Sequence, residues 1–193
     1  MEPKFGIIGC GGISRFHFHG LEKAGAKVVH IADISPEAAA PYARAFGARF
    51  STDYHDLLAD SEVTVVSVLT TGKYHRDICL AALEAGKDVI CEKTMTDNAD
   101  EAEEVTRAAT KAAQSGQLFF TAFMKRFFPA AQKAKELLPQ LGRLFSAQVR
   151  AWQQWGNFYE MDNIKGWEWV IERYGGAVLK CAGSHMLDMT MNL

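Results

Sequence analysis

Short runs of apolar residues alternate with longer segments of helical periodicity over the first 123 residues. Five of these runs are too short for helices and are rich in Val, Ile and Phe: Phe5–Gly9, Val28–Ala32, Val63–Leu69, Val89–Cys91 and Leu118–Phe123. Because they are apolar throughout, they predict strands that are buried on both faces, as in a parallel sheet. The helical candidates are Ile13–Ala24, Pro36–Phe46, Tyr54–Ala59, Tyr74–Ala85 and Asn98–Ser115. The alternation predicts a doubly wound α/β domain.

Proline and glycine mark the ends of these helical candidates. Pro36 follows Ser35, and a proline at the first helical position after a capping residue is a typical helix start. Glycine stands just past four helical segments, where the chain often turns through a left-handed residue; these positions are Gly25, Gly47, Gly86 and Gly116.

The pattern changes after about residue 124. Phe127–Leu138 has helical periodicity, Leu144–Trp152 alternates loosely like a strand, and a further helical pattern begins near Ala177. We therefore predict a domain over residues 1–123 and the beginning of a second one, of the α+β class, over residues 124–193. The lone strand has no later strand to pair with, so we expect this second domain to be incomplete and the chain to be a fragment or to be completed elsewhere.

The composition argues against several classes of protein. With 48% hydrophobic residues and a net charge of −2 the chain is not of the disordered type. The longest run without a charged residue, Ala112–Met124, has thirteen residues, whereas a membrane-spanning helix needs about 20. The 21 basic and 23 acidic residues offer no electrostatic case for a nucleic-acid or membrane-surface partner.

The four cysteines lie far apart and form no C-x-x-C pair. This usage is typical of unpaired thiols in a reducing compartment and gives no sign of a zinc site. An apolar run begins within the first few residues, which leaves no room for a signal peptide before it. We therefore expect a cytoplasmic protein without a bound metal.

A glycine-rich segment, Gly9-Cys10-Gly11-Gly12-Ile13-Ser14, follows the first predicted strand and opens a helix. It matches the G-x-G-x-x-G/A fingerprint of dinucleotide-binding folds, with Ser14 at the last small position. Gly9 permits the tight turn and Gly11 lets the backbone approach a pyrophosphate, while the helix N-terminus, at Gly12 and Ile13, supplies unpaired amides. An ordinary strand–helix turn is the other interpretation.

The position of Asp33 favours dinucleotide binding over an ordinary strand–helix turn. Asp33 ends the second predicted strand, 22 residues after Gly11. A carboxylate at this place can accept hydrogen bonds from the ribose hydroxyls of NAD and repels the 2′-phosphate of NADP. No Arg or Lys follows Asp33 before Arg44, so the sequence predicts NAD rather than NADP.

Polar residues also follow two other strands, in the segments Thr70–His75 and Glu92-Lys93-Thr94. Open α/β sheets bind ligands at the carboxyl ends of their strands, so we expect these segments to lie beside the glycine loop. A lysine beside a nicotinamide could hydrogen-bond a substrate hydroxyl and assist its deprotonation. Taken alone, a lysine after a strand is more often simply solvated.

Near the C-terminus, Cys181, His185 and Asp188 are spaced by four and three residues and would form one stripe on a helix. Histidine is well suited to proton transfer near neutrality. The spacing alone favours a hydrogen-bonded core histidine, with Asp188 as its partner or as a solvated acid. His17 and His19 face different ways on a helix, which argues against a metal site.

The motifs together resemble those of the Gfo/Idh/MocA oxidoreductases, the family of glucose–fructose oxidoreductase and inositol dehydrogenase. His75–Thr96 (HRDICLAALEAGKDVICEKTMT) resembles the family segment H-x-x-x-x-x-A-L-x-A-G-K-x-V-x-x-E-K-P. Met124–Pro129 (MKRFFP) resembles R-R-F-x-P, and Gly175–Met189 (GGAVLKCAGSHMLDM) resembles G-G-G-x-L-x-D-x-G-x-H-x-x-D. The matches are ordered along nearly the whole chain. Family members are usually much longer, with an open antiparallel sheet that completes the second domain.

The resemblance implies a Rossmann-type domain followed by the start of an α+β substrate domain, and hydride transfer between NAD and a sugar, polyol or sugar derivative. Lys93 would match the catalytic lysine and His185 the catalytic histidine. Thr70, His75 and Glu92 would lie around the cofactor with the glycine loop and Asp33.

Substrate contacts are expected from Lys93, His185, Asp188 and Trp155. Trp155 belongs to a segment that holds all four tryptophans, from Trp152 to Trp169. This segment is interpreted equally as a wall against a sugar ring and as a core or subunit contact. We also expect a homo-oligomer formed through the second-domain sheet.

Two positions depart from the family pattern. Thr94 stands where the family has proline, which could loosen the backbone that holds Lys93, and Cys181 stands where it has aspartate. A neutral thiol neither orients an imidazole as a carboxylate does nor accepts a proton as readily at pH 7. Two alternatives therefore stay open: an enzyme that retains NAD and transiently oxidises a sugar to assist elimination or glycosidic cleavage, and a catalytically lapsed binding or regulatory subunit.

Overall fold

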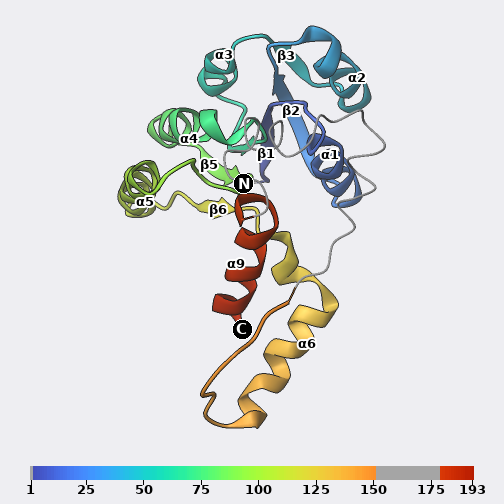
Figure 1. The fold of residues 1–193 in the computed structure, drawn as a ribbon. Helices are drawn as coiled ribbons and strands as arrows, with labels where there is room; N and C mark the ends of the chain where they lie inside the picture. The colour runs from blue at the N-terminus through green and yellow to red at the C-terminus, as the bar shows by residue number, and fades with distance from the viewer. Residues whose placement is uncertain (1, 151–178) are drawn as a thin grey trace, which may run out of the picture. The chain divides into compact units, whose positions relative to one another are not determined.

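The computed structural model describes residues 2–150 and 179–193. The chain divides into two compact units, Met1–Ala122 and Phe123–Leu193. The first unit contains, in order, β1 (Lys4–Ile8), α1 (Ser14–Lys23), β2 (Lys27–Ala32), α2 (Pro36–Phe46), β3 (Arg49–Ser51), α3 (Tyr54–Ala59), β4 (Val65–Val68), a 3₁₀ turn (Gly72–Tyr74), α4 (His75–Glu84), β5 (Asp88–Cys91), α5 (Ala99–Ala113) and β6 (Phe119–Thr121) (Figure 1).

The six strands form one sheet in the order β3-β2-β1-β4-β5-β6, and every neighbouring pair is parallel. Helices α1 and α2 cover one face and α3, α4 and α5 the other (Figure 1). The doubly wound parallel sheet predicted from the sequence is thus confirmed. The strand order reverses between β1 and β4, and in such folds the ligand crevice lies at the carboxyl ends of the two strands on either side of this reversal.

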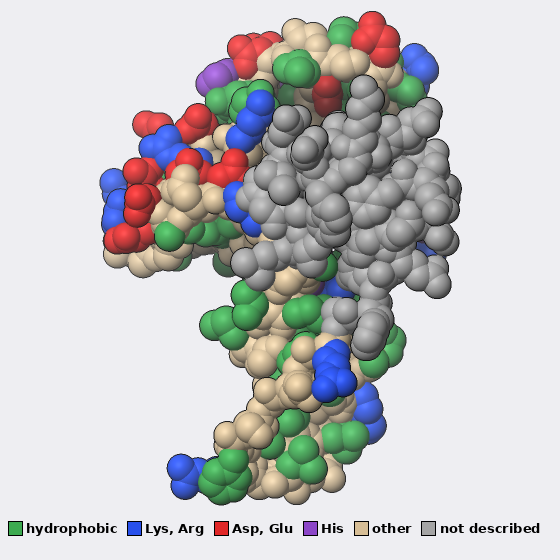
Figure 2. Space-filling model, in the orientation of Figure 1, with side chains coloured by type: hydrophobic (Ala, Val, Ile, Leu, Met, Phe, Trp, Pro, Cys, Tyr) green, Lys and Arg blue, Asp and Glu red, His purple; other side chains and the backbone are tan. Residues whose placement is uncertain are grey.

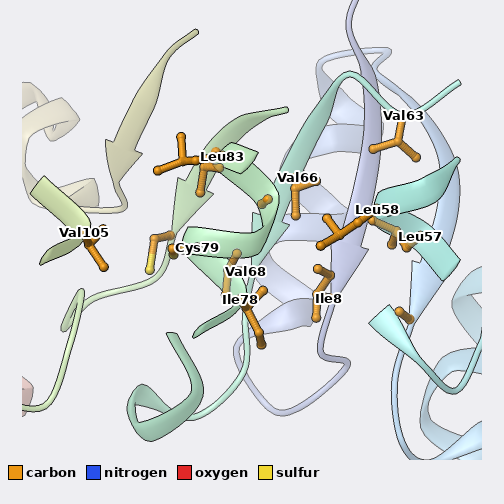
Figure 3. Packing of buried hydrophobic residues seen from close by; sticks show 14 of the residues in the cluster. Ile8, Leu57, Leu58, Val63, Val66, Val68, Ile78, Cys79, Leu83 and Val105 are labelled. Carbon is orange, nitrogen blue, oxygen red and sulfur yellow. The ribbon is translucent and has the colours of Figure 1, made fainter. Parts of the chain in front are cut away.

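Two hydrophobic clusters lie on opposite faces of the sheet. Ile7 packs with Phe18 of α1, whereas its neighbour Ile8 packs with the residues of α3 and α4, because successive side chains of a strand point to opposite faces. Figure 3 shows the second of these clusters, in which Val66, Val68 and Ile8 meet the helices. Burial of each such side chain contributes about 1.5–3 kcal/mol, which explains why the central strands are mostly apolar.

The predicted helix boundaries agree closely with the structure. The Ser35 hydroxyl accepts a hydrogen bond from the Ala38 amide at 3.3 Å, and Pro36 begins α2. The four glycines that follow helices all have left-handed backbones, with φ of +64° at Gly25, +63° at Gly47, +76° at Gly86 and +85° at Gly116.

Strand β3 has no counterpart among the predicted strands. It is three residues long, lies at the edge of the sheet, and contains one apolar residue, Phe50, which is itself exposed. An edge strand that buries little needs no apolar run, so hydrophobic patterning does not reveal it.

A partly buried polar cluster joins β2, β3 and the turn after α3. One oxygen of Asp60 accepts from His30 Nδ1 at 2.9 Å and pairs with Arg49, and the other accepts from the Glu62 amide at 2.9 Å. His30 Nε2 lies 3.1 Å from the Ser51 hydroxyl. Burial by itself raises the pKa of Asp60, but the bonds from the Glu62 amide, His30 and Arg49 together outweigh it, so this pKa lies below its usual value.

The second unit contains a 3₁₀ turn (Met124–Phe127), α6 (Pro129–Leu137), a second 3₁₀ turn (Leu138–Leu141), a π-helical turn (Leu179–Gly183) and α9 (Ser184–Asn192). The predicted strand Leu144–Trp152 is wrong as far as it is described, because residues 144–150 are exposed and form no strand. A strand needs a neighbour to pair with, and the described part of this unit contains none. The four tryptophans lie outside the described residues.

The surface over α4 and α5 carries both signs of charge. Figure 2 shows acidic and basic side chains mixed there, and two of the ion pairs join Arg76 to Glu104 and Arg107 to Glu103. Among the described residues no helix is both long enough and apolar enough to span a membrane.

Candidate active site

The glycine loop passes against the loop that follows β4. Gly9 has φ +98°, and a Cβ there would lie 2.9 Å from the backbone carbonyl carbon of Leu69 and 2.9 Å from the amide nitrogen of Thr70. Both the dihedral angle and the space therefore require glycine at this turn. Ser14 closes the far end of the loop, since its amide and its hydroxyl both donate to the Gly11 carbonyl, at 3.0 and 2.7 Å.

Gly11 and Gly12 are exposed, and a Cβ on either would meet nothing within 4 Å. Glycine at these positions is thus not required by the protein's own packing. An open backbone at the start of α1 is what a dinucleotide pyrophosphate needs, because it leaves amides accessible beside the positive end of the helix. The loop therefore fits the cofactor that the sequence predicts.

Asp33 links the end of β2 to the glycine loop. One carboxylate oxygen accepts from the Cys10 amide at 2.5 Å and the other from the Ser35 amide at 2.8 Å. A carboxylate oxygen has two lone pairs, so each can accept a further hydrogen bond from a ribose hydroxyl. Burial, together with the Asp33 charge, raises the pKa of the Cys10 thiol to about 12, which keeps this cysteine protonated.

Glu92 and Lys93 follow β5 at the same edge of the sheet. The Glu92 amide donates to the Val68 carbonyl at 2.9 Å, which extends the pairing of β5 with β4 by one residue. Its side chain is buried; one oxygen accepts from the Lys93 amide at 3.0 Å and the other from His17 at 2.8 Å. Lys93 itself is half-buried, so it differs from the fully solvated lysine that was the alternative.

His75 is 1% exposed and lies between two backbone carbonyls. Nδ1 is 2.8 Å from the Thr94 oxygen and Nε2 is 3.0 Å from the Thr70 oxygen. Since carbonyl oxygens only accept, a ring with a proton on each nitrogen donates to both and a neutral ring donates to one. The structure therefore gives His75 a contact with the loops after β4 and β5, and Thr70 contributes its carbonyl to that contact.

In the second unit, α9 carries His185 and Asp188, and both are buried. The rings of His185 and Phe123 meet edge to face, with centroids 5.9 Å apart. Asp188 is not a solvated acid, because Arg126 Nε donates to its two oxygens at 3.0 and 2.8 Å. Cys181 lies in the π-helical turn before α9, so the regular helical stripe begins only after it.

Comparison with known proteins decides the family. Residues 3–120 match the family model GFO_IDH_MocA, described as "Oxidoreductase family, NAD-binding Rossmann fold". The chain belongs to this family.

Among its relatives, inositol 2-dehydrogenase 3 of Saccharopolyspora erythraea is 32% identical over 140 residues, 72% of this chain and 41% of that protein. Levoglucosan dehydrogenase of Pseudarthrobacter phenanthrenivorans is 30% identical over 166 residues, 84% of this chain and 41% of that protein. The crystal structure of the WlbA dehydrogenase from Bordetella pertussis, in complex with NADH and UDP-GlcNAcA, has a TM-score of 0.81 and 26% identity, and the match covers 97% of this chain and 54% of that one. The chain thus spans about two fifths of the length of these curated relatives.

The Gfo/Idh/MocA membership and the NAD-binding Rossmann fold confirm the family and the fold predicted from the sequence. The structure places most of the predicted cofactor residues at one edge of the sheet of the first unit: Gly9, Gly11, Gly12, Ile13, Asp33, Thr70 and Glu92. Lys93 lies in this unit, whereas His185 and Asp188 lie in the second. Trp155 lies outside the described residues.

His17, which contacts Glu92, and Arg126, which contacts Asp188, were not predicted as site residues. His17 lies one turn into α1, three residues after Ser14, and its place in the chain does not reveal that Glu92 is its partner. Arg126 stands within the family-like segment MKRFFP, which was the signal that could have identified it. Across the described residues, no three His, Cys, Asp or Glu side chains are placed to hold a metal ion.

Proposed function

We propose that the chain provides the cofactor domain, residues 1–123, and the beginning of the substrate domain, residues 124–193, of an NAD-dependent dehydrogenase. The reaction is hydride transfer between the nicotinamide and a hydroxyl-bearing carbon of a sugar, polyol or sugar derivative. The observation that carries the proposal is the open glycine loop at one edge of the sheet, with Asp33 on one side and Glu92 and Lys93 on the other. The sugar and polyol dehydrogenases among the relatives support the substrate class.

Each residue has a distinct task in this proposal. The amides at Gly11, Gly12 and Ile13 would bind the pyrophosphate, aided by the positive end of α1. Lys93 would hydrogen-bond the substrate hydroxyl and take its proton, and His185 would share the proton transfer. Bound NAD would supply the hydride acceptor. Contacts of Asp188 and Trp155 with the sugar are also part of the proposal.

Asp33 supports NAD over NADP. Its carboxylate stands at the end of β2, where the adenosine ribose lies in Rossmann folds, and would repel a 2′-phosphate. No Lys or Arg occurs in residues 34–43 to neutralise such a phosphate.

The cellular setting and the assembly are also proposals. The three cysteines whose side chains are described, Cys10, Cys79 and Cys91, are free and buried, which supports a reducing compartment such as the cytoplasm. A homo-oligomer formed through the sheet of the second domain is also part of this proposal.

Lys93→Met tests the proposed function. Because the change removes the ammonium group and leaves the glycine loop intact, we expect turnover on sugars and polyols to be lost while NADH binding, followed by fluorescence, persists. The wild-type chain is first screened over a panel of sugars and polyols with NAD and NADP in parallel, and Lys111→Met on the outer surface of α5 serves as the control. Unchanged turnover in Lys93→Met would refute the role of the lysine, and a wild-type chain that does not bind NADH would refute the cofactor.

One observation favours a second candidate, a catalytically lapsed binding or regulatory subunit. Cys181 stands four residues before His185, where the resemblance implies an aspartate. NADH binding without turnover in the wild type, followed by turnover in Cys181→Asp, would support it. If one NAD per chain stays bound through purification and no net NADH is formed, this would instead support transient oxidation of the substrate.

A further inference from the structure

His17 and Glu92 join two parts of the first unit that lie 75 residues apart in sequence. His17 belongs to the first half of α1, the helix that begins at the glycine loop, and Glu92 is the first residue after β5. The His17 Nε2–H donates to Glu92 Oε1 at 2.8 Å, with 19% of the histidine and 11% of the glutamate side chain exposed. A contact this well shielded between a carboxylate and its donor holds both side chains in place.

The second oxygen of Glu92 acts on the backbone of the next residue. The last bond of the β4–β5 pairing is made by the Glu92 amide. The Lys93 amide lies just beyond it, and its hydrogen-bond acceptor is Glu92 Oε2, at 3.0 Å. Among the residues that the structure describes, the two carboxylate oxygens thus have one donor each. If His17 is lost, the carboxylate can rotate away from the Lys93 amide.

We propose that His17 is a positioning residue for Lys93, which acts through Glu92. It fixes the carboxylate, the carboxylate fixes the Lys93 amide, and the orientation of the lysine side chain follows from that backbone. The inference rests on the proposed function, in which Lys93 handles the substrate proton. Since the task needs only a donor at the place of Nε2, the side-chain amide of glutamine can perform it.

Three variants of the full chain test the positioning role, and hydrogen exchange of the Lys93 amide, followed by NMR, is the readout that needs no substrate. His17→Leu removes the donor, His17→Gln retains one, and His19→Leu changes an exposed histidine of the same helix as a control. We expect His17→Leu to speed the exchange of the Lys93 amide by roughly tenfold or more. His17→Gln and His19→Leu should stay within about twofold of the wild type.

Activity supplies a second readout. A misplaced catalytic group lowers the rate of the chemical step, by up to about 100-fold for a displacement near 1 Å, so kcat should fall roughly 10–100-fold in His17→Leu. The dissociation constant of NADH should change by less than about threefold, because His17 is not one of the residues that bind the cofactor. His17→Gln should restore kcat.

Glu92→Gln extends the test to the other partner of this contact. It also keeps the proposal testable if the His17→Leu chain does not fold. A glutamine has one oxygen for the two donors, so the Lys93 amide should again exchange faster. If His17 acts through Glu92, the double variant His17→Leu/Glu92→Gln should be no worse than Glu92→Gln alone, whereas additive losses would overturn the proposal.

Unchanged exchange of the Lys93 amide in both His17→Leu and Glu92→Gln would overturn it as well, and so would a His17→Gln chain as impaired as His17→Leu. A wild-type chain that binds NADH but turns over no sugar or polyol would refute the proposed function. The positioning contact would still be supported in that case, provided that exchange follows the His17 series.

Discussion

Gly9→Ala separates the folding role of the glycine loop from its binding role. A residue with a Cβ at φ +98° is strained by about 1–2 kcal/mol. The methyl group would also stand 2.9 Å from backbone atoms of Leu69 and Thr70, which directly follow the central strand β4 and cannot move aside easily. Overpacking of this kind destabilises by about 1–3 kcal/mol. Together these effects predict a loss of roughly 2–5 kcal/mol in the free energy of unfolding, or about 4–20 °C in Tm.

Gly11→Ala and Gly12→Ala are matched controls. Neither position has a left-handed backbone, and a Cβ at either meets nothing within 4 Å. We expect each to change the free energy of unfolding by less than about 1 kcal/mol. Gly11→Ala should nevertheless weaken NADH binding at least about tenfold, because its methyl group occupies the space through which the pyrophosphate approaches the backbone.

The assays are urea denaturation followed by circular dichroism and titration of the fluorescence of NADH. Stability of Gly9→Ala within about 1 kcal/mol of the wild type would refute the packing argument. A Gly11→Ala chain as unstable as Gly9→Ala would refute the separation of the two roles. Unchanged NADH binding in Gly11→Ala would show that the pyrophosphate does not lie against this residue.

Three further predictions address charge. Asp33→Ser should shift the ratio of NADH to NADPH affinities at least about tenfold toward NADPH, measured by parallel fluorescence titrations, because it removes the charge that repels a 2′-phosphate; an unchanged ratio would contradict it. Since the pKa of Asp60 is lowered in the folded state, its contribution to stability is complete above the unfolded pKa of about 3.9 and is lost as the pH falls through the lower folded value. Asp60→Asn should therefore flatten the fall in the free energy of unfolding between pH 5 and pH 2, and equal slopes would speak against the pairing with His30. Arg126→Met should leave the buried Asp188 carboxylate without its guanidinium and destabilise α9 by about 1–2 kcal/mol. This loss is smaller than for a fully buried pair because 45% of the arginine side chain is exposed. Limited proteolysis would reveal the loosened helix, and an unchanged cleavage rate would argue against the ion pair.

The first unit shows how far local rules reach. Val65–Val68 is buried at every residue, as its mostly apolar composition predicts, and Gly47 ends α2 with the left-handed backbone that its position predicts. Edge strand β3 went unpredicted because an exposed strand of three residues has almost no hydrophobic pattern. The predicted strand at Leu144–Trp152 shows the converse error: a loose alternation is not sufficient where the described chain offers no neighbouring strand.

Some residues of the candidate site could also be predicted from the sequence, whereas others could not. The glycine loop and Asp33 were found from spacing, because the phosphate and ribose contacts of a dinucleotide need residues at set distances along one strand–helix–strand unit. His17 could not be paired with Glu92 in this way, since 75 residues separate them and the pairing depends on which strand lies beside β1. His75 was expected near the cofactor, and its position between two carbonyl oxygens is visible only in the folded chain.

The sequence by itself determined the class of fold, the positions of the helices and the dinucleotide loop. Burial period, helix caps and left-handed turns act over a few residues, so they can be read along the chain. Only the tertiary structure decided which polar side chains meet. The strand order places β4 and not β2 between β1 and β5, and this order brings the start of α1 to the end of β5. Partners across such a sheet follow from topology and packing, and these arise from the sum of many weak contacts along the whole chain.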